Sequence, residues 1–326
     1  MPSLSKKMLL FVSILLLTIF ACLIYIFSPP REGPKRIGVL FYQNNPTTTA
    51  FLNGLKSGLA KQGYYEGKNL VFFVENIQDA SPEATLYVLK KIQQKRVHLL
   101  VTTGKELTLT TAHIISDKPI IYTLVARPIT DETIKTVIDK ERNVTGVSYF
   151  TPYERTLELS KRVIPNFKKL TLLIPENSSW PDFDRLHEAA ENAGIELSVA
   201  HLTLNRIPDT IAKLRSQTEA IYLPYDIQLI YQNETLKNAL LDAKLPAISN
   251  NLEYQSSCVL SYYAEPETIG GIASRMAVKI FHKAKLKYLP LELSSYFKLT
   301  INRSLLERIN IPINEDVLSY ANEVIQ

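Results

Sequence analysis

Short apolar segments alternate with longer segments of helical period along most of the chain. Several of the short segments are apolar throughout, which is typical of parallel strands that are covered on both faces. We predict strands at residues 36–42, 69–75, 98–103, 119–124, 143–148, 169–174, 195–202, 220–224, 245–249 and 258–262. Between them we predict helices at 47–62, 82–95, 105–115, 151–164, 182–193, 207–216, 227–243 and 267–283. This alternation predicts a parallel α/β architecture with right-handed crossovers.

One apolar run is much longer than these strands. Residues 8–27 carry no charged side chain and follow Lys6 and Lys7. A run of this length can span a bilayer as a helix, and the basic flank predicts that the following ~300 residues lie outside the cytoplasm. We therefore expect residues 1–30 to form a membrane anchor.

Two alternatives to a retained anchor stay open. A cleaved signal peptide usually has a shorter apolar stretch of about 7–15 residues and an A-x-A-like site, which this segment lacks. A lipoprotein would be acylated at Cys22, although Phe20 fits that pattern poorly.

Composition adds few constraints. The chain has 326 residues, of which 46% are hydrophobic, enough for a sizeable core and about two domains. Without residues 1–30 it carries 35 basic and 32 acidic side chains, a balance too mild to predict nucleic-acid binding. Cys258 is then the one cysteine left, and we expect it to be a small buried residue of a strand.

The sequence lacks the common enzymatic constellations. Its five histidines are scattered without an H-x-x-x-H pair, and there is no G-x-S-x-G elbow, Walker A loop or G-x-G-x-x-G fingerprint. Gly270 and Gly271 fall inside a predicted helix, where close packing explains them better than phosphate binding. We predict neither catalysis nor a cofactor or metal.

Polar and aromatic side chains follow several predicted strands. In open α/β sheets, ligands bind beyond the carboxyl ends of strands, where helix N-termini offer N–H donors. After the strand at 143–148, Thr151, Pro152 and Glu154 form a capping-box pattern that predicts an abrupt helix start. The other strand ends with such side chains are 42–45, 102–104, 125–127, 175–177 and 224–226.

Each type of side chain at these ends has a possible role and a plainer alternative. Aromatic residues could stack on a solute or simply cover the sheet end. Arg127 could clamp a carboxylate or be a solvated loop residue, and Asp226 and Glu265 could hold an ammonium group or cap helices. The aromatic residues concerned are Tyr42, Tyr149, Phe150, Trp180 and Tyr225.

One stretch carries a resemblance to a known family. The segment NVTGVSYFTPYERTLELSKRVIPNFKKLTLLIPENS, residues 143–178, resembles the ABC transporter substrate-binding proteins, in particular the branch for tryptophan and related aromatic amino acids. The resemblance extends over essentially all of the chain after residue 30, with the matching segments in the same order as in the family. These segments are RIGVLFYQNNP, GLKSGLAKQGYYEGKNLVFFVENIQ, DKPIIYTLVARPI, AIYLPYDIQL and ETIGGIASRMAVKIF…FKLTINRSLLERINI.

The resemblance implies a type I periplasmic binding protein fold. In this fold two α/β lobes, each a parallel sheet flanked by helices, are joined by three crossovers and close on a solute. Residues 31–148 would form the first lobe, with a return of about 264–295. Residues 149–263 would form the second, with about 296–326, and a strand at 297–302 would make the last crossing.

The resemblance also implies a set of cleft residues. Glu265 would lie at the hinge side, and two positions depart from the family pattern: Arg127 precedes a proline where an acidic residue is common, and Glu265 replaces a common aspartate. The other implied residues are Tyr42, Gln43, Asn44, Thr103, Gly104, Thr123, Ser148 and Tyr149 of the first lobe, and Asn177, Tyr225, Asp226 and Asn250 of the second.

The implied function is capture of a small solute for an ABC import system on the periplasmic side of a bacterial inner membrane. An aromatic amino acid is the leading candidate, and a membrane permease is the expected partner of a monomeric protein, anchored or released after cleavage. A membrane-anchored ligand sensor is the alternative. A sugar-repressor-type regulator would need a helix-turn-helix where the apolar run stands.

Overall fold

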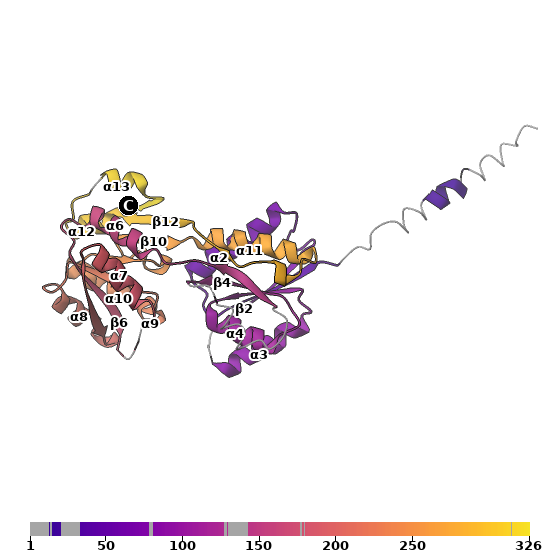
Figure 1. The fold of residues 1–326 in the computed structure, drawn as a ribbon, viewed down its shortest axis with the longest axis horizontal. Helices are drawn as coiled ribbons and strands as arrows, with labels where there is room; N and C mark the ends of the chain where they lie inside the picture. The colour runs from indigo at the N-terminus through magenta and orange to yellow at the C-terminus, as the bar shows by residue number, and fades with distance from the viewer. Residues whose placement is uncertain are drawn as a thin grey trace, which may run out of the picture.

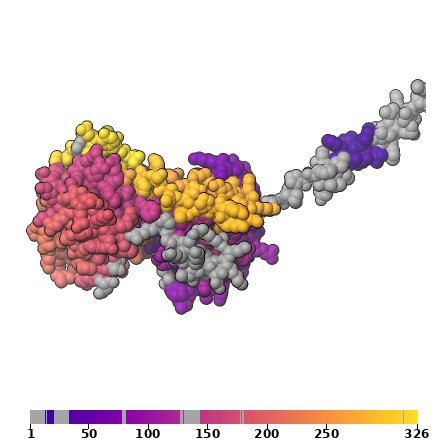
Figure 2. Space-filling view, viewed as in Figure 1, coloured from indigo at the N-terminus to yellow at the C-terminus, as the bar shows by residue number. Residues whose placement is uncertain are grey.

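The structure is a computed structural model that describes residues 13, 15–20, 33–77, 81–126, 129, 143–176, 178, 180–313 and 315–326. Two α/β lobes lie next to each other, each built on one β-sheet (Figure 1). The space-filling view shows the late part of the chain, from orange to yellow, running along one edge across both lobes (Figure 2).

The sheet of the first lobe has six strands in the order β11-β5-β4-β3-β1-β2, and each neighbouring pair is parallel. Successive residues face opposite sides, so that Val39 packs beneath one layer of helices and Leu40 beneath the other. The strands are β1 (Lys35–Phe41), β2 (Leu70–Asn76), β3 (Leu99–Thr103), β4 (Ile120–Val125), β5 (Val144–Ser148) and β11 (Glu292–Leu293). The helices are α2 (Pro46–Lys61), α3 (Pro82–Gln94), α4 (Lys105–Ile114) and α11 (Pro266–Phe281).

The second sheet has the order β13-β12-β10-β9-β8-β6-β7. Its strands are β6 (Lys169–Pro175), β7 (Glu196–Leu202), β8 (Ala220–Leu223), β9 (Ala247–Ser249), β10 (Leu260–Ala264), β12 (Phe297–Asn302) and β13 (Glu323–Ile325). Its helices are α6 (Tyr153–Val163), α7 (Phe183–Asn192), α8 (Ile207–Leu214), α9 (Ile227–Tyr231), α10 (Asn233–Asp242), α12 (Arg303–Arg308) and α13 (Glu315–Tyr320). Short 3₁₀ turns lie at Leu204–Arg206, Leu252–Tyr254 and Leu286–Tyr288.

The chain passes between the two sheets three times. It leaves the first sheet after β5, returns after β10 into α11, and leaves again between β11 and β12. Because β10 carries the chain toward the first lobe and β12 carries it back, this pair is antiparallel. The second sheet is therefore mixed, and the expectation of purely parallel sheets is wrong at this one pairing.

The return through α11 depends on close packing against α2. A Cβ at Gly270 would lie 2.2 Å from the carbonyl oxygen of Phe51, and one at Gly54 would lie 1.9 Å from that of Glu267. The close-packing interpretation is thus confirmed for Gly270. Gly271 also lies close to α2, since a Cβ at Gly58 would come 3.3 Å from its Cα, but a Cβ at Gly271 itself would meet nothing within 4 Å.

Three local predictions are corrected by the structure. The segment 227–243 forms two helices that meet at Gln232. Helix α6 begins at Tyr153 with Pro152 at the N-cap position and no side-chain cap, and the carbonyl of the buried Thr151 accepts a hydrogen bond from Arg185. Cys258 is buried as expected but lies just before β10 rather than within it.

The apolar run at 8–27 lies mostly outside the described residues. Among the residues that are described, no helix combines the length and apolar character needed to cross a membrane.

Candidate functional site

A cleft of ≈ 580 Å³ lies between the lobes, at the carboxyl ends of strands from both sheets. The first lobe contributes the residues that follow β1 and β3 and the last part of β4. The second contributes residues after β8 and β9. Pockets of this size suit small organic solutes. Tyr263 and Ala264, at the end of β10, line the cleft where the chain crosses between the lobes.

The N-terminus of α2 opens onto one side of the cleft. Asn45 caps this helix by accepting a hydrogen bond from the backbone N–H of Thr48 at 2.9 Å. The neighbouring N–H of Thr47 donates to the carboxylate of Glu253 at 3.0 Å. Since Glu253 belongs to the second lobe, this charge-assisted bond links the lobes across the cleft.

The N-terminus of α4 opens onto the cleft without a side-chain cap. Gly104 takes the N-cap position at φ = 80°, a left-handed conformation that glycine adopts without strain. Lys105 and Glu106 follow it and also line the cleft. The first N–H groups of a helix together with a lysine form a favourable setting for a carboxylate.

Three tyrosines give the cleft its aromatic surface. Tyr42 and Tyr149 come from the first lobe and Tyr225 from the second, where it is 57% exposed. The hydroxyl of Tyr225 donates to the Gln43 side chain across the cleft at 3.5 Å. Burial raises the pKa of Tyr149 to about 12, with a smaller contribution from Tyr225, so this phenol is neutral at physiological pH.

Two polar residues of the second lobe support the cleft wall. Asp226 caps α9 by accepting from the N–H groups of Gln228 and Leu229, at 2.8 and 3.1 Å. The Asn250 amide donates to the hydroxyl of Thr156 and accepts from Tyr222. The capping role considered for Asp226 is therefore confirmed, and Asn250 is held rigidly in place.

Strand β4 ends in an irregular segment that forms part of the cleft. The register with β5 shifts between Tyr122 and Val125. Within this shift Leu124 has φ = 55°, which costs an L-residue roughly 1–2 kcal/mol. Leu124 lines the cleft and is half-buried. Strain of this kind often occurs at ligand sites.

The structure brings together eight of the residues implied by the resemblance. These line one cleft: Tyr42, Gln43, Thr103, Gly104, Tyr149, Tyr225, Asp226 and Asn250. Arg127 and Asn177 lie outside the described residues, so their roles stay predictions.

Four other residues implied by the resemblance are not among the described residues that line the cleft. Asn44 is exposed beside the cleft. Thr123 and Ser148 are buried, and their hydroxyls donate to the carbonyls of neighbouring strands. Glu265 precedes α11 and accepts a hydrogen bond from the Thr268 hydroxyl.

The aromatic residues near the second lobe have different surroundings. Trp180 packs against Tyr153 and Tyr222, with ring centroids 5.8 and 5.5 Å away, as a covering residue of that lobe. Phe150 is exposed, and the guanidinium of Arg185 lies 5.8 Å from its ring centroid.

Sequence reasoning missed several residues of the cleft. Thr47, Lys105 and Glu106 lie at helix N-termini, and Glu253 lies in a 3₁₀ turn from which its carboxylate reaches Thr47 across the cleft. The segments NNPTT and TTGKE carried a usable signal, because both join a strand end directly to a helix start. Among the described residues, no group of three or more His, Cys, Asp or Glu side chains is placed to hold a metal ion.

Comparisons with known proteins agree with this geometry. The family described as ABC transporter substrate binding protein matches residues 36–325. A tyrosine-binding protein of Clostridioides difficile is 22% identical over 293 residues, covering 88% of this chain and 84% of the relative.

Solved structures show the same fold. A Streptococcus pneumoniae ABC domain in complex with L-Trp has a TM-score of 0.74 and 24% identity, covering 90% of this chain and 100% of that one. A ligand-free, open substrate-binding protein with adhesive properties from Clostridium difficile has a TM-score of 0.72 and 20% identity, covering 90% and 99%. These neighbours and the matched family are solute-binding proteins rather than enzymes. The chain belongs to the family of ABC transporter substrate-binding proteins.

Proposed function

We propose that this protein captures an aromatic amino acid in the cleft between its lobes and delivers it to an ABC permease. The observation that carries the proposal is the pairing of an uncapped helix N-terminus, that of α4, with tyrosines from both lobes in one cleft. The names of a tyrosine-binding relative and of an L-Trp complex support the same class of solute.

Each part of such a solute has a complementary surface. The carboxylate would lie at the N-terminus of α4, near Gly104 and Lys105. The aromatic ring would lie against Tyr149 and Tyr225, where offset or edge-to-face contacts add about 0.5–1.5 kcal/mol beyond simple burial. The α-ammonium group would face the Asp226 carboxylate, which already accepts two backbone N–H groups.

Binding would favour the closed arrangement of the lobes. The two lobes are connected through the three chain crossings, which can act as a hinge. A solute that contacts Gly104 in one lobe and Tyr225 in the other would hold the lobes together. The Glu253–Thr47 bond and the Tyr225–Gln43 contact already join the lobes and would support the closed arrangement. The permease would then recognise the closed protein.

The proposal includes an extracytoplasmic location with the segment 1–30 as a membrane anchor, and monomeric action. The basic flank and the apolar run at 8–27 support the anchor. The domain boundaries proposed from the resemblance, at about 148, 263 and 295, are compatible with the three passages between the sheets.

Isothermal titration with L-tyrosine, L-tryptophan, L-phenylalanine, L-leucine and D-ribose tests the solute class. We expect the aromatic amino acids to bind at least tenfold more tightly than L-leucine, and D-ribose not to bind. Tyr225→Ala should weaken aromatic binding about tenfold, whereas Tyr225→Phe, which keeps the ring, should weaken it less than threefold. Equal losses in both variants would assign the contact to the hydroxyl, and preferred binding of L-leucine or ribose would refute the aromatic class.

A further inference from the structure

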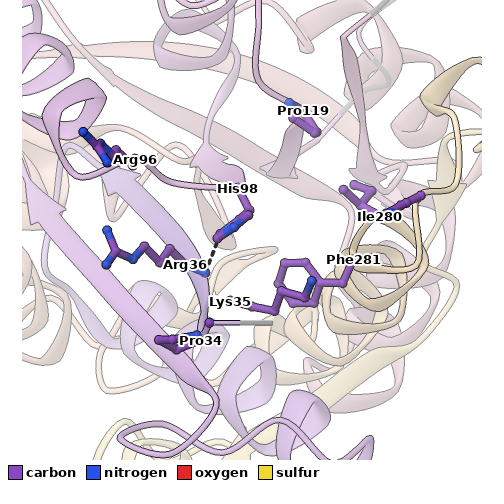
Figure 3. A pocket seen from close by; sticks show the side chains of 10 residues that line it. Pro34, Lys35, Arg36, Arg96, His98, Pro119, Ile280 and Phe281 are labelled. Atoms are coloured by element: carbon purple, nitrogen blue, oxygen red, sulfur yellow. Dashed lines mark hydrogen bonds between the residues drawn. The ribbon is translucent and has the colours of Figure 1, made fainter. Parts of the chain in front are cut away.

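A second cavity lies at the opposite end of the first lobe from the cleft. It has a volume of ≈ 630 Å³ and opens at the amino ends of the strands, where Lys35 begins β1 and His98 precedes β3 (Figure 3). Strand β1 has seven residues, so the two sites are separated by about 23 Å of sheet. The described linings of the cavity and the cleft have no residue in common.

The described residues that line this cavity carry one sign of charge. Lys35, Arg36, Arg96 and Lys283 contribute four cationic side chains, and none of the described lining residues is an aspartate or glutamate. Figure 3 shows Arg36 and Arg96 on the same side of the cavity. Several like charges around one cavity attract an anion more strongly than any one of them does alone.

Local contacts hold several of these groups in position. Arg36 donates through Nη1 to the carbonyl of Lys95 at 3.0 Å, at the end of α3. Its backbone N–H donates to Nδ1 of His98, also at 3.0 Å, which fixes the orientation of the imidazole ring. A guanidinium has five donors in a planar fork, so Arg36 can hold the helix end and still face a phosphate or carboxylate.

Two of the cations stand at left-handed positions just after helices. Arg96 has φ = 50° after α3, and Lys283 has φ = 64° after α11. Glycine is the usual residue there, because an L-residue in this conformation is strained. Lys244 has the same conformation after α10, with φ = 50°, but does not line the cavity. The attraction between a basic side chain and a helix C-terminus is therefore enough to explain a basic residue at such a position. What distinguishes Arg96 and Lys283 is that both line the same cavity.

The cavity also has an apolar side. Phe281, Ile280, Pro34 and Pro119 line it, and the ammonium group of Lys35 lies 5.9 Å from the centroid of the Phe281 ring. A basic rim next to an apolar wall suits an amphiphile whose charged group is anionic.

We propose that this cavity binds a phosphate-bearing anion, with the headgroup of an anionic phospholipid as its source. Gly33 and Pro34 line the cavity, and residues 28–34 can separate it from the apolar run at 8–27 by at most about 25 Å. Basic clusters next to a membrane attract anionic lipids. The bound headgroup would orient the first lobe on the bilayer, with the cleft at its far end. This inference rests on the proposed membrane anchor and is independent of which solute the cleft takes.

The test uses the full-length protein in a non-ionic detergent. Binding of dihexanoyl phosphatidylglycerol is compared with that of dihexanoyl phosphatidylcholine and of inorganic phosphate. Arg96→Gly and Lys283→Gly each remove one charge at a left-handed position that glycine tolerates, so neither should destabilise the fold. Lys244→Gly is the matched control, because it removes one charge from an equivalent position outside the cavity.

We expect the anionic lipid to bind at least fivefold more tightly than the zwitterionic one. Arg96→Gly and Lys283→Gly should each lose about fivefold in affinity, as for one basic side chain near an anionic surface, while Lys244→Gly stays unchanged. Binding of inorganic phosphate as tight as that of the lipid, with the same dependence on Arg96 and Lys283, would support the anion site and assign its source to free phosphate. Equal affinity for both lipids without phosphate binding, or equal losses in all three variants, would overturn the proposal.

Discussion

The strained backbone of Leu124 gives a prediction whose sign is unusual. At an ordinary strand position, replacing alanine by glycine costs about 0.5–1 kcal/mol, because glycine loses more conformational freedom on folding. Leu124 has φ = 55°, a conformation that costs an L-residue about 1–2 kcal/mol and glycine almost nothing. The two effects oppose each other, and the strain is the larger one.

Leu124→Gly should therefore be more stable than Leu124→Ala, by about 0.5–1 kcal/mol. Both variants lose the apolar contacts of the leucine side chain beyond Cβ, so these cancel in the comparison. Chemical denaturation followed by circular dichroism measures the difference in unfolding free energy. Ala200→Gly, at a half-buried position of strand β7, is the control and should be destabilised by about 0.5–1 kcal/mol.

The same two variants also probe the cleft. Because Leu124 lines the cleft, both should bind L-tyrosine about 5–30-fold more weakly, which corresponds to about 1–2 kcal/mol of lost apolar contact. If Leu124→Ala proves more stable than Leu124→Gly, the left-handed conformation is refuted. Unchanged affinity in both would remove Leu124 from the solute contacts.

Three further predictions concern packing, titration and closure. Gly270→Ala should lower the unfolding free energy by about 1–3 kcal/mol, because its Cβ would collide with α2, whereas Gly271→Ala should raise it by about 0.5–1 kcal/mol in calorimetry. Tyr149 has a raised pKa of about 12, so the stability linked to its neutral phenol is complete below pH 10 and is lost as the pH rises to 12. Between pH 9 and 11 the unfolding free energy of the wild type should therefore fall by about 1 kcal/mol more than that of Tyr149→Phe. Equal losses would refute the raised pKa. Glu253→Gln weakens the charged bond to Thr47 across the cleft and should raise the Kd for L-tyrosine about fivefold, while an unchanged Kd would show that this bond does not assist closure.

The sequence pattern predicted most of the fold because period and length are local properties. Continuous apolar segments such as 36–42 and 169–174 became internal strands, each next to an edge strand of its sheet. Two-residue β11 is too short to show a period, and the break between α9 and α10 at Gln232 has no proline or glycine to mark it. The three crossings came from the family resemblance, since no local pattern specifies which sheet a strand joins.

The cleft was predictable only in outline. The rule that ligands bind at carboxyl strand ends led to Tyr42, Thr103 and Tyr225, which do line it. The rule could not tell which side chains at a strand end point away from the cleft. Thr123 is such a residue, because its hydroxyl donates to the carbonyl of Thr102 in the neighbouring strand. The strained Leu124 depends on a register shift with β5 that its own sequence does not reveal.

The basic cavity was not predictable at all from the sequence. Its cations are separated by long stretches of chain, with Arg36, Arg96 and Lys283 brought together by a strand start and two helix ends. Each one alone is an ordinary surface residue. Their convergence is a property of the fold.

The most direct test of the central claim is a crystal structure of the protein grown with L-tyrosine. We expect the amino acid between the lobes, with its carboxylate on the N-terminus of α4 and its ring against Tyr149 and Tyr225. A fully occupied L-tyrosine elsewhere on the molecule, or a closed cleft that holds a solute without an aromatic ring, would contradict the account.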